Sequence, residues 1–96
     1  MNARERLRRN YRTAFLRYLP GRDEAALAAG YQIGRSSVSD DLTIVELVHV
    51  HHDVLRDVLR SSSAAELDDV TATAADFLGE VLATYEMARR GYFARP

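Results

Sequence analysis

The chain has 96 residues, 47% of them hydrophobic, and a formal net charge of −1, which fits one small domain with an ordinary core and argues against disorder. It contains no cysteine, which excludes a disulfide framework, thiolate metal ligands and a cysteine nucleophile. No apolar run approaches the ~18 residues that span a bilayer, and no signal peptide is recognisable, so we expect a cytoplasmic protein without a membrane partner.

The first predicted helix covers residues 2–19 and is rich in arginine. Its apolar side chains recur at three- and four-residue steps, and Pro20-Gly21 ends it. Segment 1–22 holds seven arginines against Glu5, whereas residues 23–86 carry a net charge of −10. No glycine-rich loop or second basic cluster supports phosphate binding. We therefore expect no nucleic-acid partner, and an arginine face packed beside the acidic remainder of the fold or a partner.

The second predicted helix runs from Asp23, its N-cap, to about Ser37. Its inward-facing residues are expected to be Leu27, Tyr31 and Gly34. Gly30 and Gly34 leave one face nearly bare, at a cost of about 1 kcal/mol each relative to alanine, which predicts that another helix approaches closely there. A loop is expected next, formed by Ser36, Ser37, Ser39, Asp40 and Asp41.

The third predicted helix begins at a capping box, Thr43 with Glu46, and extends to about Arg60. Its buried face is expected to consist of Ile44, Leu47, Val48, His51, Val54, Leu55, Val58 and Leu59. Because His51 lies on this apolar stripe, a hydrogen-bonded core or interface histidine is favoured. Burial or a nearby carboxylate would also allow it to act as a pH switch.

The last predicted helix is the longest, from Ala64 to Tyr92, and begins at a second capping box, Ser63 with Glu66. Its apolar positions share one broad face: Leu67, Val70, Ala74, Phe77, Leu78, Val81, Leu82, Tyr85 and Ala88. At about 1.5 Å per residue the helix would be roughly 40 Å long, more than a domain of this size needs to cover its core. No segment alternates with a period of two, so the expected fold class is all-α, about four helices in a small bundle.

A metal site is the alternative function that the third helix leaves open. Glu46 and His49 have the E-x-x-H spacing found in di-iron bundles, and His52 and Asp53 lie beside them. Such sites need a second E-x-x-H helix and two further inward glutamates, and this chain has one such motif. The alternative is thus a small metal- or ligand-binding protein that uses these four residues, whereas the main interpretation includes no cofactor and no metal.

Two further functions are disfavoured. The serines of the predicted loops lack a G-x-S-x-G context and oxyanion glycines, so we expect no catalytic residue and no enzyme. Residues 24–42 have some features of a helix-turn-helix, but the turn would be two residues too long. Asp40 and Asp41 would also face the phosphates, which is electrostatically unfavourable.

Three segments resemble the N-terminal regulatory domain of RsbU-type stress-response serine phosphatases: residues 30–35, 46–55 and 77–92. Their order, their spacing and the four-helix layout carry the resemblance. Proteins of this kind have the domain ahead of a coiled-coil linker and a metal-dependent phosphatase domain, which is absent from residues 1–96. The resemblance implies a single regulatory and dimerisation domain over this range, either the N-terminal part of a longer phosphatase or a free-standing relative.

The resemblance also implies what the domain does. It would form a homodimer and bind a regulatory partner similar to the switch kinase RsbT, and this binding would raise a phosphatase activity directed at a phosphoserine anti-anti-sigma protein. We expect the partner surface to include Tyr31, Gly34, Arg35 and His51. The dimer contact is expected near Phe77, Val81, Tyr85 and Ala88. The long helix would act as the output rod, leaving the domain through residues 90–92.

Overall fold

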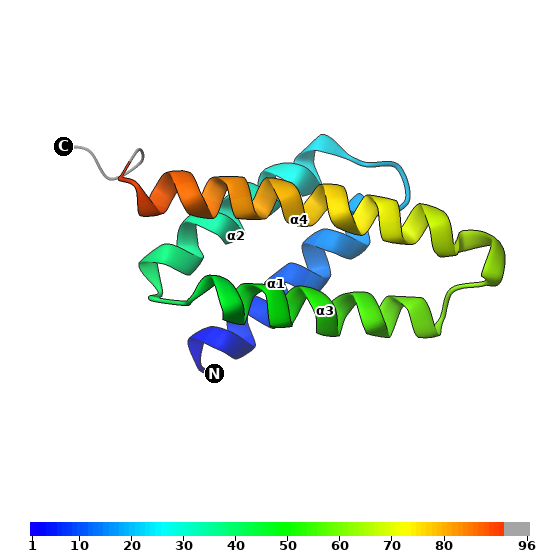
Figure 1. Ribbon diagram of the computed structural model, residues 1–96, viewed down its shortest axis with the longest axis horizontal. Helices are drawn as coiled ribbons and strands as arrows, with labels where there is room; N and C mark the ends of the chain where they lie inside the picture. The colour runs from blue at the N-terminus through cyan, green and yellow to red at the C-terminus, as the bar shows by residue number, and fades with distance from the viewer. Residues whose placement is uncertain (92–96) are drawn as a thin grey trace.

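A computed structural model describes residues 1–91, which form four α-helices and one 3₁₀ turn and contain no strand (Figure 1). The elements are α1 (Ala3–Tyr18), α2 (Glu24–Ser39), α3 (Ile44–Arg60), η1 (Ala64–Glu66) and α4 (Leu67–Arg89). The predicted all-α fold is confirmed. The predicted end of the last helix, Tyr92, lies outside the described residues. No helix in the described part of the chain has the length and apolar character that crossing a membrane requires.

Hydrogen bonds at the helix starts explain where the helices begin. The Asp23 carboxylate accepts from the backbone N–H two residues later, at 3.3 Å. Both bonds of the Thr43 capping box are present, at 3.1 Å to the threonine hydroxyl and 2.9 Å to the Glu46 carboxylate. The N–H of Ser63 donates to Glu66 at 2.6 Å, and this bond lowers the pKa of Glu66. The predicted starts at Asp23 and Thr43 are thus confirmed, whereas the Ser63 capping box precedes the 3₁₀ turn η1 and α4 itself begins at Leu67.

The serine segment predicted as a loop is part of a helix, because α2 continues to Ser39. The hydroxyls of Ser36, Ser37 and Ser39 donate to carbonyl oxygens three or four residues earlier. Serine favours loops because its hydroxyl competes for backbone groups, but these bonds run back along the helix and are compatible with it. The same continuous helix excludes a helix-turn-helix within residues 24–42.

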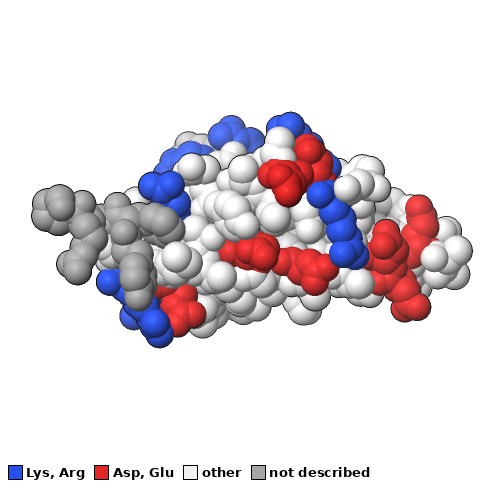
Figure 2. Space-filling view, turned by 90° about the horizontal axis from the view of Figure 1, so that it is seen from above, with Lys and Arg blue, Asp and Glu red and all other residues white. Residues whose placement is uncertain are grey.

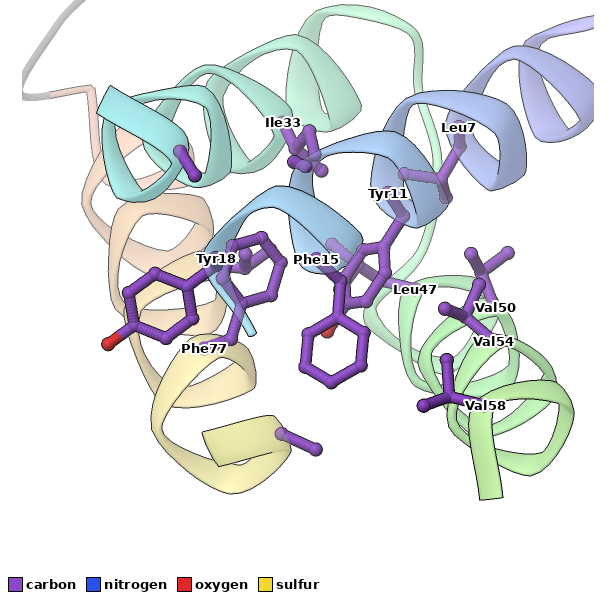
Figure 3. Close-up of a cluster of buried hydrophobic side chains, with 14 of the residues drawn as sticks. Leu7, Tyr11, Phe15, Tyr18, Ile33, Leu47, Val50, Val54, Val58 and Phe77 are labelled. Atoms are coloured by element: carbon purple, nitrogen blue, oxygen red, sulfur yellow. The ribbon is translucent and has the colours of Figure 1, made fainter. Parts of the chain in front are cut away.

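The core lies where the four helices face one another (Figure 3). Phe77 of α4 is fully buried, and its ring lies 5.2, 5.8 and 5.4 Å from those of Tyr11, Phe15 and Tyr18 on α1. α3 adds a row of aliphatic side chains to this cluster: Leu47, Val50, Val54 and Val58. Val50 was missing from the predicted α3 face, although it is 1% exposed.

Three residues predicted to face inward are exposed to solvent instead. Ile44 and Leu67 are the first residues of α3 and α4, so they lie at the ends of the bundle where fewer neighbours cover them. Tyr31 is 40% exposed because it lies on the solvent side of α2, outside the row of buried positions. The buried positions of α2 are Ala26, Gly30, Ile33, Gly34 and Ser37.

α2 and α4 pack closely because two glycines of α2 face α4. A Cβ atom at Gly34 would lie 2.6 Å from the carbonyl oxygen of Val81 and 2.9 Å from the nitrogen of Tyr85. One at Gly30 would lie 3.1 Å from the Phe77 ring. The predicted close approach of another helix is therefore confirmed, and α4 is the helix that approaches.

The long helix lies along its own domain. α4 has 23 residues, which makes it about 34 Å long, and it follows the longest dimension of the bundle beside α2 (Figure 1). It ends at Arg89. Gly91 then has a φ of +88°, and its N–H donates to the carbonyl oxygen of Ala88 at 3.0 Å. Positive φ is readily adopted by glycine, which makes it a common helix-ending residue.

Candidate functional site

Two of the four residues predicted for a partner surface meet on the outside of the bundle. Tyr31 and Arg35, one turn apart on α2, line a groove of about 430 Å³ between α2 and α4. The opposite wall comes from α4, through Glu80, Ala83, Thr84 and Met87. Because Tyr31 is 40% exposed and Met87 44% exposed, this α2–α4 groove presents apolar surface to solvent.

The α2–α4 groove carries both signs of charge, with Arg35 on one wall and Glu80 on the other. The negative charge of Glu80 and, to a smaller extent, a side-chain hydrogen bond with it raise the pKa of Tyr31, so the phenol interacts with the opposite wall of the groove. Figure 2, which looks down on α4, shows acidic groups along the middle and at one end of this face, beside a wide uncharged area. Tyrosine, methionine and arginine on such a surface are the residues enriched in protein–protein contacts.

Gly34 and His51, the other two predicted partner residues, lie in the interior. Gly34 is beneath the groove against the backbone of α4, so it determines how closely α2 and α4 approach. His51 of α3 is 7% exposed, and its Nδ1 forms a hydrogen bond of 2.8 Å with the Tyr11 hydroxyl of α1. The hydrogen-bonded core histidine favoured by the sequence is confirmed, but Tyr11 was not identified as its partner.

Burial shifts the pKa values of both members of the Tyr11–His51 pair. The pKa of His51 is lowered by desolvation and, to a smaller extent, by the charge of His52. Desolvation raises the pKa of Tyr11. Both shifts favour the neutral forms, as expected for ionisable groups removed from water. The pair is therefore neutral at pH 7 and joins α1 to α3 inside the core.

The residues predicted near a dimer contact belong mainly to the core of the single chain. Phe77, Val81 and Tyr85 are at most 5% exposed, and the Tyr85 hydroxyl donates to the carbonyl oxygen of Leu42 at 2.8 Å. Ala88 is half-buried. A contact between two copies along α4 would accordingly use exposed residues on its outer side. Exposed residues of α4 include four small ones, Ala72, Ala75, Gly79 and Ala83, and also the acidic Asp76 and Glu86.

The residues of the metal alternative do not form a site. The Glu46 carboxylate is bonded within its capping box, and Asp53 forms an ion pair of 3.1 Å with Arg8. Within residues 1–91, no three histidine, aspartate or glutamate side chains are grouped as a metal ion would require. His49 and His52 are exposed on α3. The described geometry therefore gives the metal alternative no support.

The arginine face of α1 packs beside acidic residues of the same chain, as predicted. Arg8 pairs with Asp53 at 3.1 Å and with Asp57 at 3.3 Å, and Arg12 pairs with Asp57 at 3.5 Å. All four side chains are more than a third exposed, so each pair is worth at most about 1 kcal/mol. These ion pairs neutralise part of the basic helix and join it to α3.

Comparison with known proteins gives one result that covers most of the chain. A family model described as "Phosphoserine phosphatase RsbU, N-terminal domain" matches residues 9–88. This range contains both walls of the α2–α4 groove and the glycine pair beneath it. No curated protein and no solved structure matches the chain. The family match confirms the resemblance inferred from the three sequence segments.

Proposed function

The chain belongs to the family of RsbU N-terminal domains, and from this premise we propose that it is a regulatory module that binds a protein partner and thereby controls a serine phosphatase. The family is defined by the N-terminal domain of that phosphatase, so the module acts through binding and the chemistry belongs to a separate domain. The partner is a switch-kinase-like protein of a bacterial stress-response pathway. Its binding raises the phosphatase activity that controls a sigma factor.

The α2–α4 groove is the observation that supports this proposal. Tyr31 and Met87 offer exposed apolar surface, while Arg35 and Glu80 offer one charge of each sign. A partner surface that places a carboxylate near Arg35 and an apolar side chain between Tyr31 and Met87 would bury aromatic and thioether area. Such central aromatic and arginine contacts usually supply most of the binding energy.

Close packing beneath the groove gives binding a structural consequence. Because Gly34 allows α2 to pack against the backbone of α4, a partner that binds in the groove shifts the two helices as one unit. We also propose that the module is a homodimer in which the outer face of α4 meets its copy, with Ala75, Gly79 and Ala83 allowing close approach. Partner binding then changes how the two α4 helices cross.

A charge reversal in the groove tests partner binding. The purified chain is titrated calorimetrically with the switch-kinase-like protein from the same genome, using wild type, Arg35→Glu and the control Arg56→Glu, which makes the same change on the exposed side of α3. We expect Arg35→Glu to weaken binding at least tenfold and Arg56→Glu to have little effect. Equal affinities for all three proteins would contradict the proposed surface, provided that thermal melts show each one folded.

Sedimentation velocity tests the proposed dimer. At micromolar concentration we expect a dimer for wild type and a monomer for Ala75→Glu, because the new carboxylate would be buried against its copy in the α4 contact. Ala25→Glu, at an exposed position at the start of α2, should remain dimeric. A monomeric wild-type chain at this concentration would refute the dimer and leave partner binding to be judged by the calorimetry.

A further inference from the structure

A second groove lies on the other side of α2, between α1 and α2, with a volume of about 380 Å³. It is hollow because small side chains face each other there: Ala14 of α1 and Ala29 of α2 form the floor together with Ile33. Gln32 lines both this groove and the α2–α4 groove. The exposed side of α2 therefore separates the α1–α2 groove from the α2–α4 groove.

The α1–α2 groove is cationic. Arg9 and Arg17 line it, and the side chain of neither forms an ion pair or hydrogen bond with any residue within 1–91. Arg8 and Arg12, by contrast, pair with acidic residues of α3. No aspartate or glutamate of the described chain lines this groove, whereas Glu80 lines the other. No acidic side chain among residues 1–91 therefore pairs with the two arginines of this groove.

The geometry of the groove suits a helix better than a small ion. Arg9 and Arg17 are eight residues apart on α1, so about 12 Å of helix axis separates them. Polar side chains line the walls between them: Asn10, Thr13, Gln32 and Ser36. On a bound helix, two carboxylates seven or eight residues apart share one face and span a similar distance. The apolar residues between them would lie on Ile33 and the two alanines.

We propose that the α1–α2 groove binds an acidic amphipathic helix of a partner protein, with Arg9 and Arg17 each holding one of two carboxylates two helical turns apart. Arginine suits this role because its guanidinium group can donate two parallel hydrogen bonds to a carboxylate. The apolar floor favours a protein helix over nucleic acid, and the net charge of −10 on residues 23–86 opposes the approach of a long polyanion. This proposal does not depend on the function assigned to the α2–α4 groove.

Two synthetic helices of 18 residues provide the test. One carries two glutamates seven residues apart with leucines between them on the same face, and its control carries glutamine at both positions; both are labelled with fluorescein. Fluorescence anisotropy with the 96-residue chain measures their affinities. We expect the glutamate helix to bind at least tenfold more tightly at about 50 mM salt, with a smaller ratio at higher salt because screening weakens exposed charge pairs.

Paired variants and amide NMR locate the binding. Arg9→Gln/Arg17→Gln should abolish the difference between the two peptides, whereas Arg4→Gln/Arg56→Gln, which removes two exposed arginines that do not line the groove, should preserve it. Shifts caused by the glutamate helix are expected in residues 9–17 and 29–36. Equal affinities for both peptides, shifts confined to other segments, or tighter binding of a DNA duplex of comparable length would each overturn the proposal.

Discussion

The two contacts on opposite sides of the bundle, α2 with α4 and α1 with α3, are maintained by different physical means. α2 meets α4 through backbone atoms, with no room for a Cβ at Gly34. α1 meets α3 through the buried Tyr11–His51 hydrogen bond and the exposed ion pairs of Arg8. The first contact depends on shape, so pH and salt should leave it unchanged. The second also contains aliphatic packing, but its hydrogen bond and ion pairs depend on protonation and charge, so it should weaken in acid or in high salt.

The largest expected effect comes from adding one methyl group to the α2–α4 contact. Gly34→Ala would place a Cβ within 3 Å of backbone atoms of α4, which cannot rotate aside. Overpacking costs about 1–3 kcal/mol, and we expect the upper end, reduced by about 1 kcal/mol because alanine favours the helix. Urea unfolding should therefore show a loss of about 2 kcal/mol.

Gly79→Ala is the matched control for that substitution. Within the single chain, nothing lies within 4 Å of the position that its Cβ would occupy. When unfolding is measured at concentrations where the chain is monomeric, only the helix propensity therefore changes. We expect a gain of about 0.5–1 kcal/mol. If both alanine variants were more stable than the wild type, α2 and α4 would not be in close backbone contact. The difference between the α2–α4 and α1–α3 contacts would then be wrong.

The next largest effect should follow from removing the buried hydroxyl that joins α1 to α3. Tyr11→Phe leaves His51 Nδ1 without its hydrogen-bond partner, at a cost of about 1–2 kcal/mol for a buried polar group. Tyr18→Phe removes a hydroxyl from another ring that packs on Phe77, and it should change stability little. Equal losses in the two variants would show that the histidine bond contributes nothing specific.

The Tyr11–His51 contact should also make stability depend on pH. Because the pKa of His51 is lowered in the folded chain, the unfolded chain binds a proton near pH 6.5 that the folded chain does not. This contribution to stability is complete above pH 6.5 and is lost as the pH falls towards the folded-state pKa. In a histidine NMR titration, His51 should titrate below the ordinary value. Titration of His51 at or above pH 6.5 would contradict this prediction.

The smallest effect is expected at the surface of the same contact. Arg8→Ala removes ion pairs to Asp53 and Asp57, whose side chains are exposed by a third or more. We expect a loss below about 1 kcal/mol at low salt that disappears near 1 M salt. Gly34→Ala should lose the same stability at both salt concentrations. A salt-independent loss for Arg8→Ala would indicate that the arginine acts through packing of its aliphatic stem.

The sequence predicted features that depend on nearby residues. The capping boxes and Gly30-to-Gly34 spacing are local signals, and the structure confirms them. Spacing along one helix could not reveal which neighbour covers a face, so Tyr31 was assigned to the interior and Val50 was missed. The Tyr11–His51 bond joins positions 40 residues apart, and no local pattern links them. For the same reason, the length of α4 did not predict that the helix lies along α2, where Tyr31 and Arg35 meet its side chains.

The left-handed turn at Gly91 has a mechanical consequence. An α-helix transmits twist about its axis because each N–H is bonded to a carbonyl oxygen four residues back. At Gly91 the N–H donates instead to a carbonyl oxygen three residues back, that of Ala88, and φ is positive, so the regular α-helical hydrogen bonding of α4 stops there. The run of hydrogen bonds that resists twisting therefore ends before Gly91, whereas a sideways displacement of the end of α4 still moves Gly91 with it. We therefore expect the end of α4 to transmit sideways displacement better than rotation about the helix axis.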